Sequence, residues 1–159
     1  MKTNGTPPPD EPPLAAALRA CADGLYPAEA AAELLISHAS WLCRDDFRNG
    51  YVDIGTSITD GITAMAEIDW PAAITALDEG GLPASGGERR ILRLAASLAD
   101  GIPVDLRDAF TGMDTANVDR ALRAMLHASG RRPRGTERPG NQSITAMTIW
   151  PRTEDQRQR

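Results

Sequence analysis

The chain has 159 residues, of which 42% are hydrophobic and 25% are charged, as in globular proteins that bury a core of their own. It contains no run of 18 apolar residues, so we expect no transmembrane helix, and its first residues lack the apolar stretch of a signal peptide. Two cysteines, Cys21 and Cys43, are too few for a disulfide scaffold. These features favour a cytoplasmic protein with free thiols.

The net charge of −5 is unevenly distributed. Residues 1–83 contain 4 basic and 13 acidic residues, whereas residues 84–138 contain 10 arginines and 7 acidic residues. Because nucleic acids attract basic surfaces, only the second half is a candidate for contact with a polyanion.

The chain begins with a proline-rich segment, residues 1–13, that we expect to be disordered. The helical domain is predicted to span residues 14–130. Its first helix covers residues 14–22, and a second, amphipathic helix is predicted to run from residue 28 to about Cys43, with Asn49-Gly50 closing the next turn.

Residues 51–68 fit a helix because Ile54, Ile58 and Ile62 recur at a spacing of four. The two glycines in this segment and its threonines make a strand the alternative. A further helix is predicted from Asp69, its N-cap, to Gly80.

Three short helices, each with its own start and stop signals, are predicted between residues 85 and 130. Ser85 and Glu88 form a capping box for the first, and Gly101 ends it. The second helix begins after Asp105 and ends at Gly112. The third begins after Asp114 and ends at Gly130.

The last 29 residues, 131–159, form a basic tail rich in proline, glycine and arginine, in which residues 143–150 are a candidate strand. The predicted fold is therefore mainly α: a single small helical domain with one short C-terminal strand.

Residues 91–130 resemble the core of helix-turn-helix and winged-helix regulators in the spacing of their helices and of the turn at Gly112. The resemblance implies that the third helix enters the major groove of DNA. The implied DNA-contact candidates are Thr115, Asn117, Arg120, Arg123, Arg131, Arg132 and Arg134. Asp114 and Asp119 depart from this pattern, because carboxylates repel phosphates.

Residues 82–114, which overlap this segment, also resemble, more loosely, small actinobacterial proteins without an assigned activity. The function predicted from the sequence is that of a small non-enzymatic regulatory protein that contacts DNA through the helix-turn-helix-like segment. The alternative is an adaptor that binds another protein through its acidic N-terminal helices, with Trp41 and Trp70 as anchors, because aromatic side chains dominate interface hot spots.

No catalytic motif was found in the sequence. Ser85-Gly86-Gly87-Glu88 resembles the signature motif of ABC-type ATPases, but the lysine of a phosphate-binding loop is missing after Gly86. The histidines and cysteines lack the spacing of metal ligands. We therefore expect no enzyme activity, no cofactor and no metal.

Overall fold

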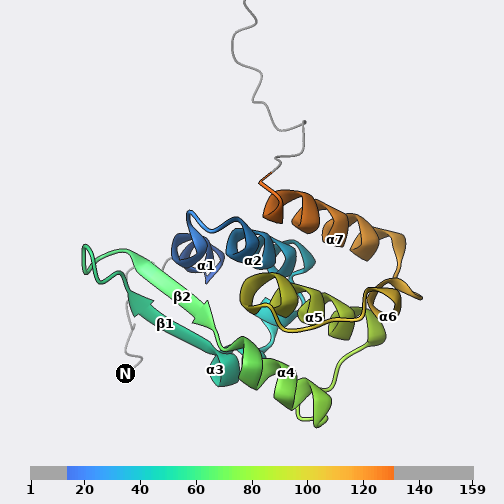
Figure 1. The fold of residues 1–159 in the computed structure, drawn as a ribbon. Coiled ribbons are helices and arrows are strands. Elements are labelled where there is room, and N and C mark those ends of the chain that lie inside the picture. Colours follow the sequence, from blue (N-terminus) through green and yellow to red (C-terminus); the bar gives the residue numbers. More distant parts are fainter. Residues whose placement is uncertain (1–13, 131–159) are drawn as a thin grey trace, which may run out of the picture.

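A computed structural model describes residues 14–130, and both the proline-rich segment 1–13 and the tail 131–159, with its predicted strand at 143–150, lie outside the described residues. The described part contains seven α-helices and one two-stranded antiparallel sheet (Figure 1). The prediction of a mainly helical fold is confirmed.

The first two helices are α1 (Leu14–Ala22) and α2 (Tyr26–His38). They are separated by Gly24, whose φ of 85° is readily adopted only by glycine. Helix α2 lies at the centre of the molecule, packed against α1, α5 (Gly86–Asp100) and α7 (Thr115–Ala128) (Figure 1). Its central position explains why it carries buried side chains on more than one side.

The prediction that the second helix continues to Cys43 is wrong. Helix α2 ends at His38, Ala39 adopts a φ of 64°, and a separate 3-10 helix, η1 (Trp41–Cys43), follows. The break allows Trp41 to turn into the core, where it is 0% exposed and its Nε1 donates to the carbonyl oxygen of Glu88 at 3.0 Å. The predicted turn at Asn49-Gly50 is also wrong, since both residues lie in helix α3 (Asp45–Tyr51).

The helix favoured for residues 51–68 is likewise absent, and the alternative of a strand is confirmed in the form of a hairpin. Strands β1 (Val52–Thr56) and β2 (Ala64–Ile68) pair antiparallel, with Ile54 opposite Ala66. The regularly spaced isoleucines do not form a buried helical face. Ile54, Ile58 and Ile62 are 55%, 103% and 84% exposed, respectively.

Helix α4 (Trp70–Asp78) starts as predicted, since the side chain of Asp69 accepts a hydrogen bond from the backbone N–H of Ala72 at 3.0 Å. The three capped helices of the second half are also confirmed: α5, α6 (Leu106–Phe110) and α7. Ser85 and Glu88 form both bonds of the capping box, Gly101 ends α5 in the left-handed conformation, and Asp105 and Asp114 cap the other two helices.

One continuous core joins these elements. Helix α5 packs along α2 and contributes five buried residues, whereas the hairpin packs on α1 through Ala66 and Ile68 of β2. Strand β1 and the outer face of α7, with Leu122 and Leu126, are consequently more exposed to solvent than the faces that pack in this core.

Candidate functional site

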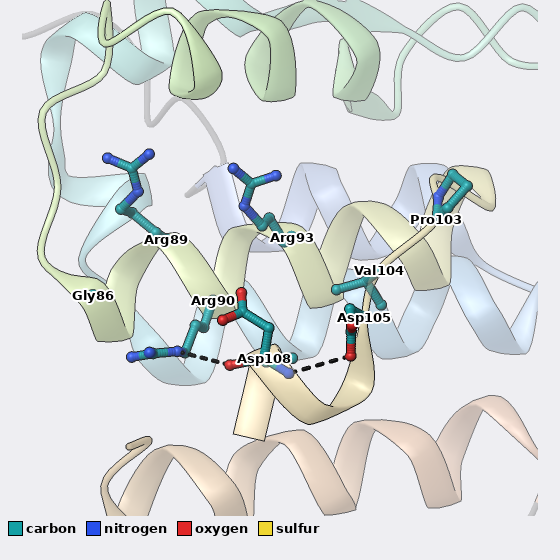
Figure 2. A pocket seen from close by; sticks show the side chains of 9 residues that line it. Gly86, Arg89, Arg90, Arg93, Pro103, Val104, Asp105 and Asp108 are labelled. Atoms are coloured by element: carbon teal, nitrogen blue, oxygen red, sulfur yellow. Dashed lines mark hydrogen bonds between the residues drawn. The ribbon is translucent and has the colours of Figure 1, made fainter. Parts of the chain in front are cut away.

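One hollow, of about 530 Å³, lies between α5 and the loop that leads into α6, and three arginines of α5 line it (Figure 2). Arg93 forms an ion pair with Asp78 of α4, and Arg89 donates to the carbonyl oxygen of Leu77 at 3.4 Å. Arg90 donates to the carbonyl oxygen of Asp108 at 3.1 Å. All three side chains therefore tie α5 to its neighbours, which is a structural role.

A second hollow is a groove of about 430 Å³ between α2 and α7. Its apolar lining comes from Ala30, Leu34 and Ala124, and its polar lining from Glu33, Ser37, Arg120, Arg123 and His127. On α7 the polar residues follow a spacing of three and four, so they share one face of the helix. This groove brings together two of the predicted DNA-contact residues, Arg120 and Arg123.

The polar groups beside the groove differ in how far they are already engaged. Arg120 is half-buried and donates from Nη1 to Oδ1 of Asn117 at 3.0 Å. Glu33 accepts two hydrogen bonds from Arg19 of α1, at 2.5 and 3.1 Å. Arg123 is exposed and makes no hydrogen bond or ion pair with any residue between 14 and 130. Arg123 is therefore available to a ligand.

The two helices are joined at the end of the groove by His127 and Glu29, whose Nε2 and Oε2 atoms lie 2.6 Å apart. Tyr26 adds an edge-on contact with the His127 ring. This junction connects the start of α2 with the last turn of α7, so it links the two groove walls at that end.

His38, the last residue of α2, follows Ser37 of the groove. Its Nδ1 is buried without a hydrogen-bond partner in the described part of the chain. Burial lowers the pKa of His38 below its usual value, and the positive charge of Arg120 lowers it further, while Glu88 and Asp114 act in the opposite direction. We therefore expect a neutral imidazole here at pH 7.

The remaining predicted contact residues do not gather in the groove. Thr115 is exposed in the first turn of α7, but Asn117 is only 7% exposed, and its Nδ2 donates to the Asp114 carboxylate at 2.7 Å. Asn117 therefore cannot reach a DNA base in this conformation. Arg131, Arg132 and Arg134 lie outside the described residues.

Neither predicted protein-interface anchor is a freely exposed aromatic side chain. Trp41 is fully buried, and Trp70 is half-buried against the core. Trp41, predicted as an interface anchor, therefore presents no surface to a partner in this conformation.

Sequence reasoning did not identify Glu33 and His127 as site residues. For His127 a signal existed, since residues 120, 123 and 127 recur at helical spacing. No such signal existed for Glu33, because its proximity to α7 depends on the packing of two helices that are distant in sequence.

The groove offers hydrogen-bond donors over an apolar floor, an arrangement suited to binding a carboxylate-bearing ligand. Within residues 14–130, no group of three or more His, Cys, Asp or Glu side chains is placed to hold a metal ion. None of the helices in this part of the chain combines the length and the hydrophobicity that a transmembrane span requires. In comparisons with known proteins, no family model, no curated protein and no solved structure matches this chain.

Proposed function

We propose that this protein is a non-enzymatic adaptor that binds a segment of another protein in the groove between α2 and α7. The observation that carries the proposal is the position of Arg123, an arginine without a partner among the described residues, beside an apolar floor. A groove between two helices is also a common place to receive an amphipathic segment.

The chemistry of the groove specifies the bound segment. Apolar side chains would cover Leu34 and Ala124, and one carboxylate would accept charge-assisted hydrogen bonds from Arg123. Residues 14–130 contain nine arginines and 17 acidic residues, a formal charge of −8. This charge disfavours segments with many carboxylates, so the partner segment is apolar, with a single acidic residue and otherwise neutral or basic side chains.

Regulation through DNA contact is the second candidate, supported by the exposure of Thr115 and Arg123 on α7. Asp114 and Asp119 are also exposed near the start of this helix, and the folded residues are acidic as a whole. Both features oppose binding to phosphates. Protein docking is therefore the favoured proposal.

The test is selection from a displayed library of random 12-residue peptides, followed by measurement of Kd for the enriched sequences. We expect peptides that combine apolar residues with a single carboxylate. Arg123→Glu should weaken their binding at least about tenfold, as expected for loss of a charge-assisted bond. The matched control is Arg107→Glu, which makes the same charge change at an exposed position on α6 outside the groove and should leave Kd unchanged.

Equal Kd values for the two variants, or a library without enriched peptides, would overturn the docking proposal. Fluorescence anisotropy with a labelled duplex DNA at low salt provides the second arm of the test. Micromolar DNA binding that is lost in Arg123→Glu but kept in Arg107→Glu would establish the DNA candidate instead.

A further inference from the structure

The hairpin has an open edge along β1. Two backbone hydrogen bonds establish which groups face this edge: Ser57 N–H donates to the carbonyl oxygen of Thr63 at 2.8 Å, and Asp69 N–H donates to the carbonyl oxygen of Tyr51 at 2.9 Å. Because hydrogen-bonded pairs alternate along an antiparallel ladder, the odd-numbered residues of β1 bond to β2. The N–H and C=O groups of Ile54 and Thr56 therefore point away from β2, and they have no hydrogen-bond partner within residues 14–130.

Beside the exposed polar side chains of Asp53 and Thr56, β1 presents one uncovered apolar side chain, Ile54. Ile54 shares a sheet face with Ala66, which packs against α1, but Ile54 itself remains 55% exposed because α1 covers β2 rather than β1 (Figure 1). Neither proline nor lysine interrupts β1, although natural proteins commonly use these residues to block an open edge. A two-stranded sheet is also marginal by itself, so this edge is suited to a further strand.

The tail of the same chain repeats four residues that include the start of β2. Residues 144–147 read Ile-Thr-Ala-Met, as do residues 62–65, which comprise the last two residues of the turn and the first two of β2. Each copy is followed within a few residues by isoleucine and then by Trp-Pro, with two fewer residues between the shared positions in the tail. A segment that shares the residues of an existing partner of β1 is compatible with pairing to β1.

Charge and reach agree with this pairing. Residues 52–69 contain four acidic and no basic residues, whereas residues 131–159 contain seven arginines and three acidic residues. Residues 131–142, which connect α7 to the segment, number 12. Twelve extended residues span up to roughly 40 Å. The widths of the two intervening helices, α1 and α2, add to about 20 Å, so the connection is long enough for the segment to reach β1.

We propose that residues 143–150 add to the free edge of β1 as a third strand, which covers Ile54 and neutralises the acidic hairpin. No residue of the hairpin lines the α2–α7 groove, so pairing at β1 is independent of the proposed docking function. It assigns the basic tail an intramolecular role in place of DNA contact.

Amide hydrogen exchange of the ¹⁵N-labelled full chain tests the proposal. The N–H groups of Ile54 and Thr56 should exchange at least about tenfold more slowly in the natural chain than in Ala146→Pro, because proline within the added strand removes a donor and disrupts pairing. The matched control is Gln156→Pro, a proline substitution in the tail beyond the segment, which should preserve the protection.

Equal exchange of Ile54 and Thr56 in the natural chain and in Ala146→Pro would overturn the proposal, whether exchange is fast or slow. Protection that increases with protein concentration would also overturn it, since pairing would then occur between two copies of the chain. The amides of Ile91 and Leu92 in the buried part of α5 report whether the variants remain folded.

Discussion

At the scale of single residues, the boundary between α2 and η1 depends on Ala39. Its φ of 64° places it in a region that L-residues with a Cβ atom adopt at an energetic cost. The burial of Trp41 and its bond to Glu88 hold the chain in this conformation. Burial of the Trp41 indole therefore offsets the energetic cost of the backbone conformation at Ala39.

We expect Ala39→Gly to increase the free energy of unfolding by about 0.5–1 kcal/mol, because glycine adopts this φ without a Cβ clash. Urea unfolding measures the effect. The control Ala16→Gly, at an exposed helical position of α1, should instead lower stability. A loss of stability in Ala39→Gly would show that the turn is not strained.

Glu88 is a second residue on which several elements depend. Its carboxylate accepts hydrogen bonds from the Ser40 hydroxyl and from Ser85 N–H, the latter at 2.8 Å. These bonds favour the ionised form and lower the pKa of Glu88 from 4.5 to about 2. The carboxylate therefore connects the segment before η1 with the start of α5.

Glu88→Gln should lower the free energy of unfolding by about 1–2 kcal/mol at pH 7, because the charge-assisted bonds become neutral ones. Since the pKa is lowered in the folded state, the contribution of Glu88 is complete above pH 4.5 and is lost as the pH falls toward about 2. The difference between the natural chain and the variant should therefore shrink over this range. Urea unfolding at several pH values tests this, with Glu79→Gln as an exposed control.

At the scale of elements, the hairpin depends on its connection, in which Asp60 organises the turn. Its carboxylate accepts from the N–H groups of Ile62 and Thr63, at 2.9 and 3.0 Å, and from the Thr63 hydroxyl at 2.5 Å. The Thr63 hydroxyl and these N–H groups lower the pKa of Asp60 to about 2. Gly61 supplies the positive φ that lets the chain reverse.

Asp60→Ala should loosen the turn, so the N–H groups of Ile62 and Thr63 should exchange faster with solvent. In the natural chain the same loosening should occur as the pH falls from 3.8 to about 2, where Asp60 becomes protonated. Thr59→Ala changes a neighbouring side chain that makes no hydrogen bond in the described structure and serves as the control. If the N–H groups of Ile62 and Thr63 exchange at the same rate in Asp60→Ala as in the natural chain, the Asp60 side chain does not stabilise the turn.

At the scale of the whole molecule, α2 joins the N-terminal and C-terminal parts of the described chain. It packs against α1, α5 and α7, and its Leu35 is 0% exposed. A destabilising substitution in α2 should therefore reduce the stability of all these helices together.

Leu35→Ala should cost about 2–5 kcal/mol of unfolding free energy, because it leaves a cavity in the core. The same substitution at Leu126, which is 46% exposed on α7, should cost less than about 1 kcal/mol. Circular dichroism and tryptophan fluorescence should report one common unfolding transition in both variants. Separate transitions would contradict the role of α2 as a shared core element.

The candidate site could be predicted from the sequence only in part. Arg120 and Arg123 were singled out by their position on the third capped helix, and both line the α2–α7 groove. Asn117 was singled out for the same reason, but its side chain is buried and bonded to Asp114 and Arg120. Exposure differs between neighbouring positions of α7 because it depends on packing against α2 and α5, which are distant in sequence.

The mainly helical class and the limits of α5, α6 and α7 follow from the sequence without knowledge of the packing. Their signals are local: Ser85, Asp105 and Asp114 satisfy N–H groups two or three residues away. Three other features depend on tertiary contacts: the end of α2, the hairpin of residues 52–68, and the groove between α2 and α7. The first depends on Trp41 reaching α5, and the second on β2 packing against α1. Such contacts join residues far apart in the chain, so no local spacing of residue types could reveal them.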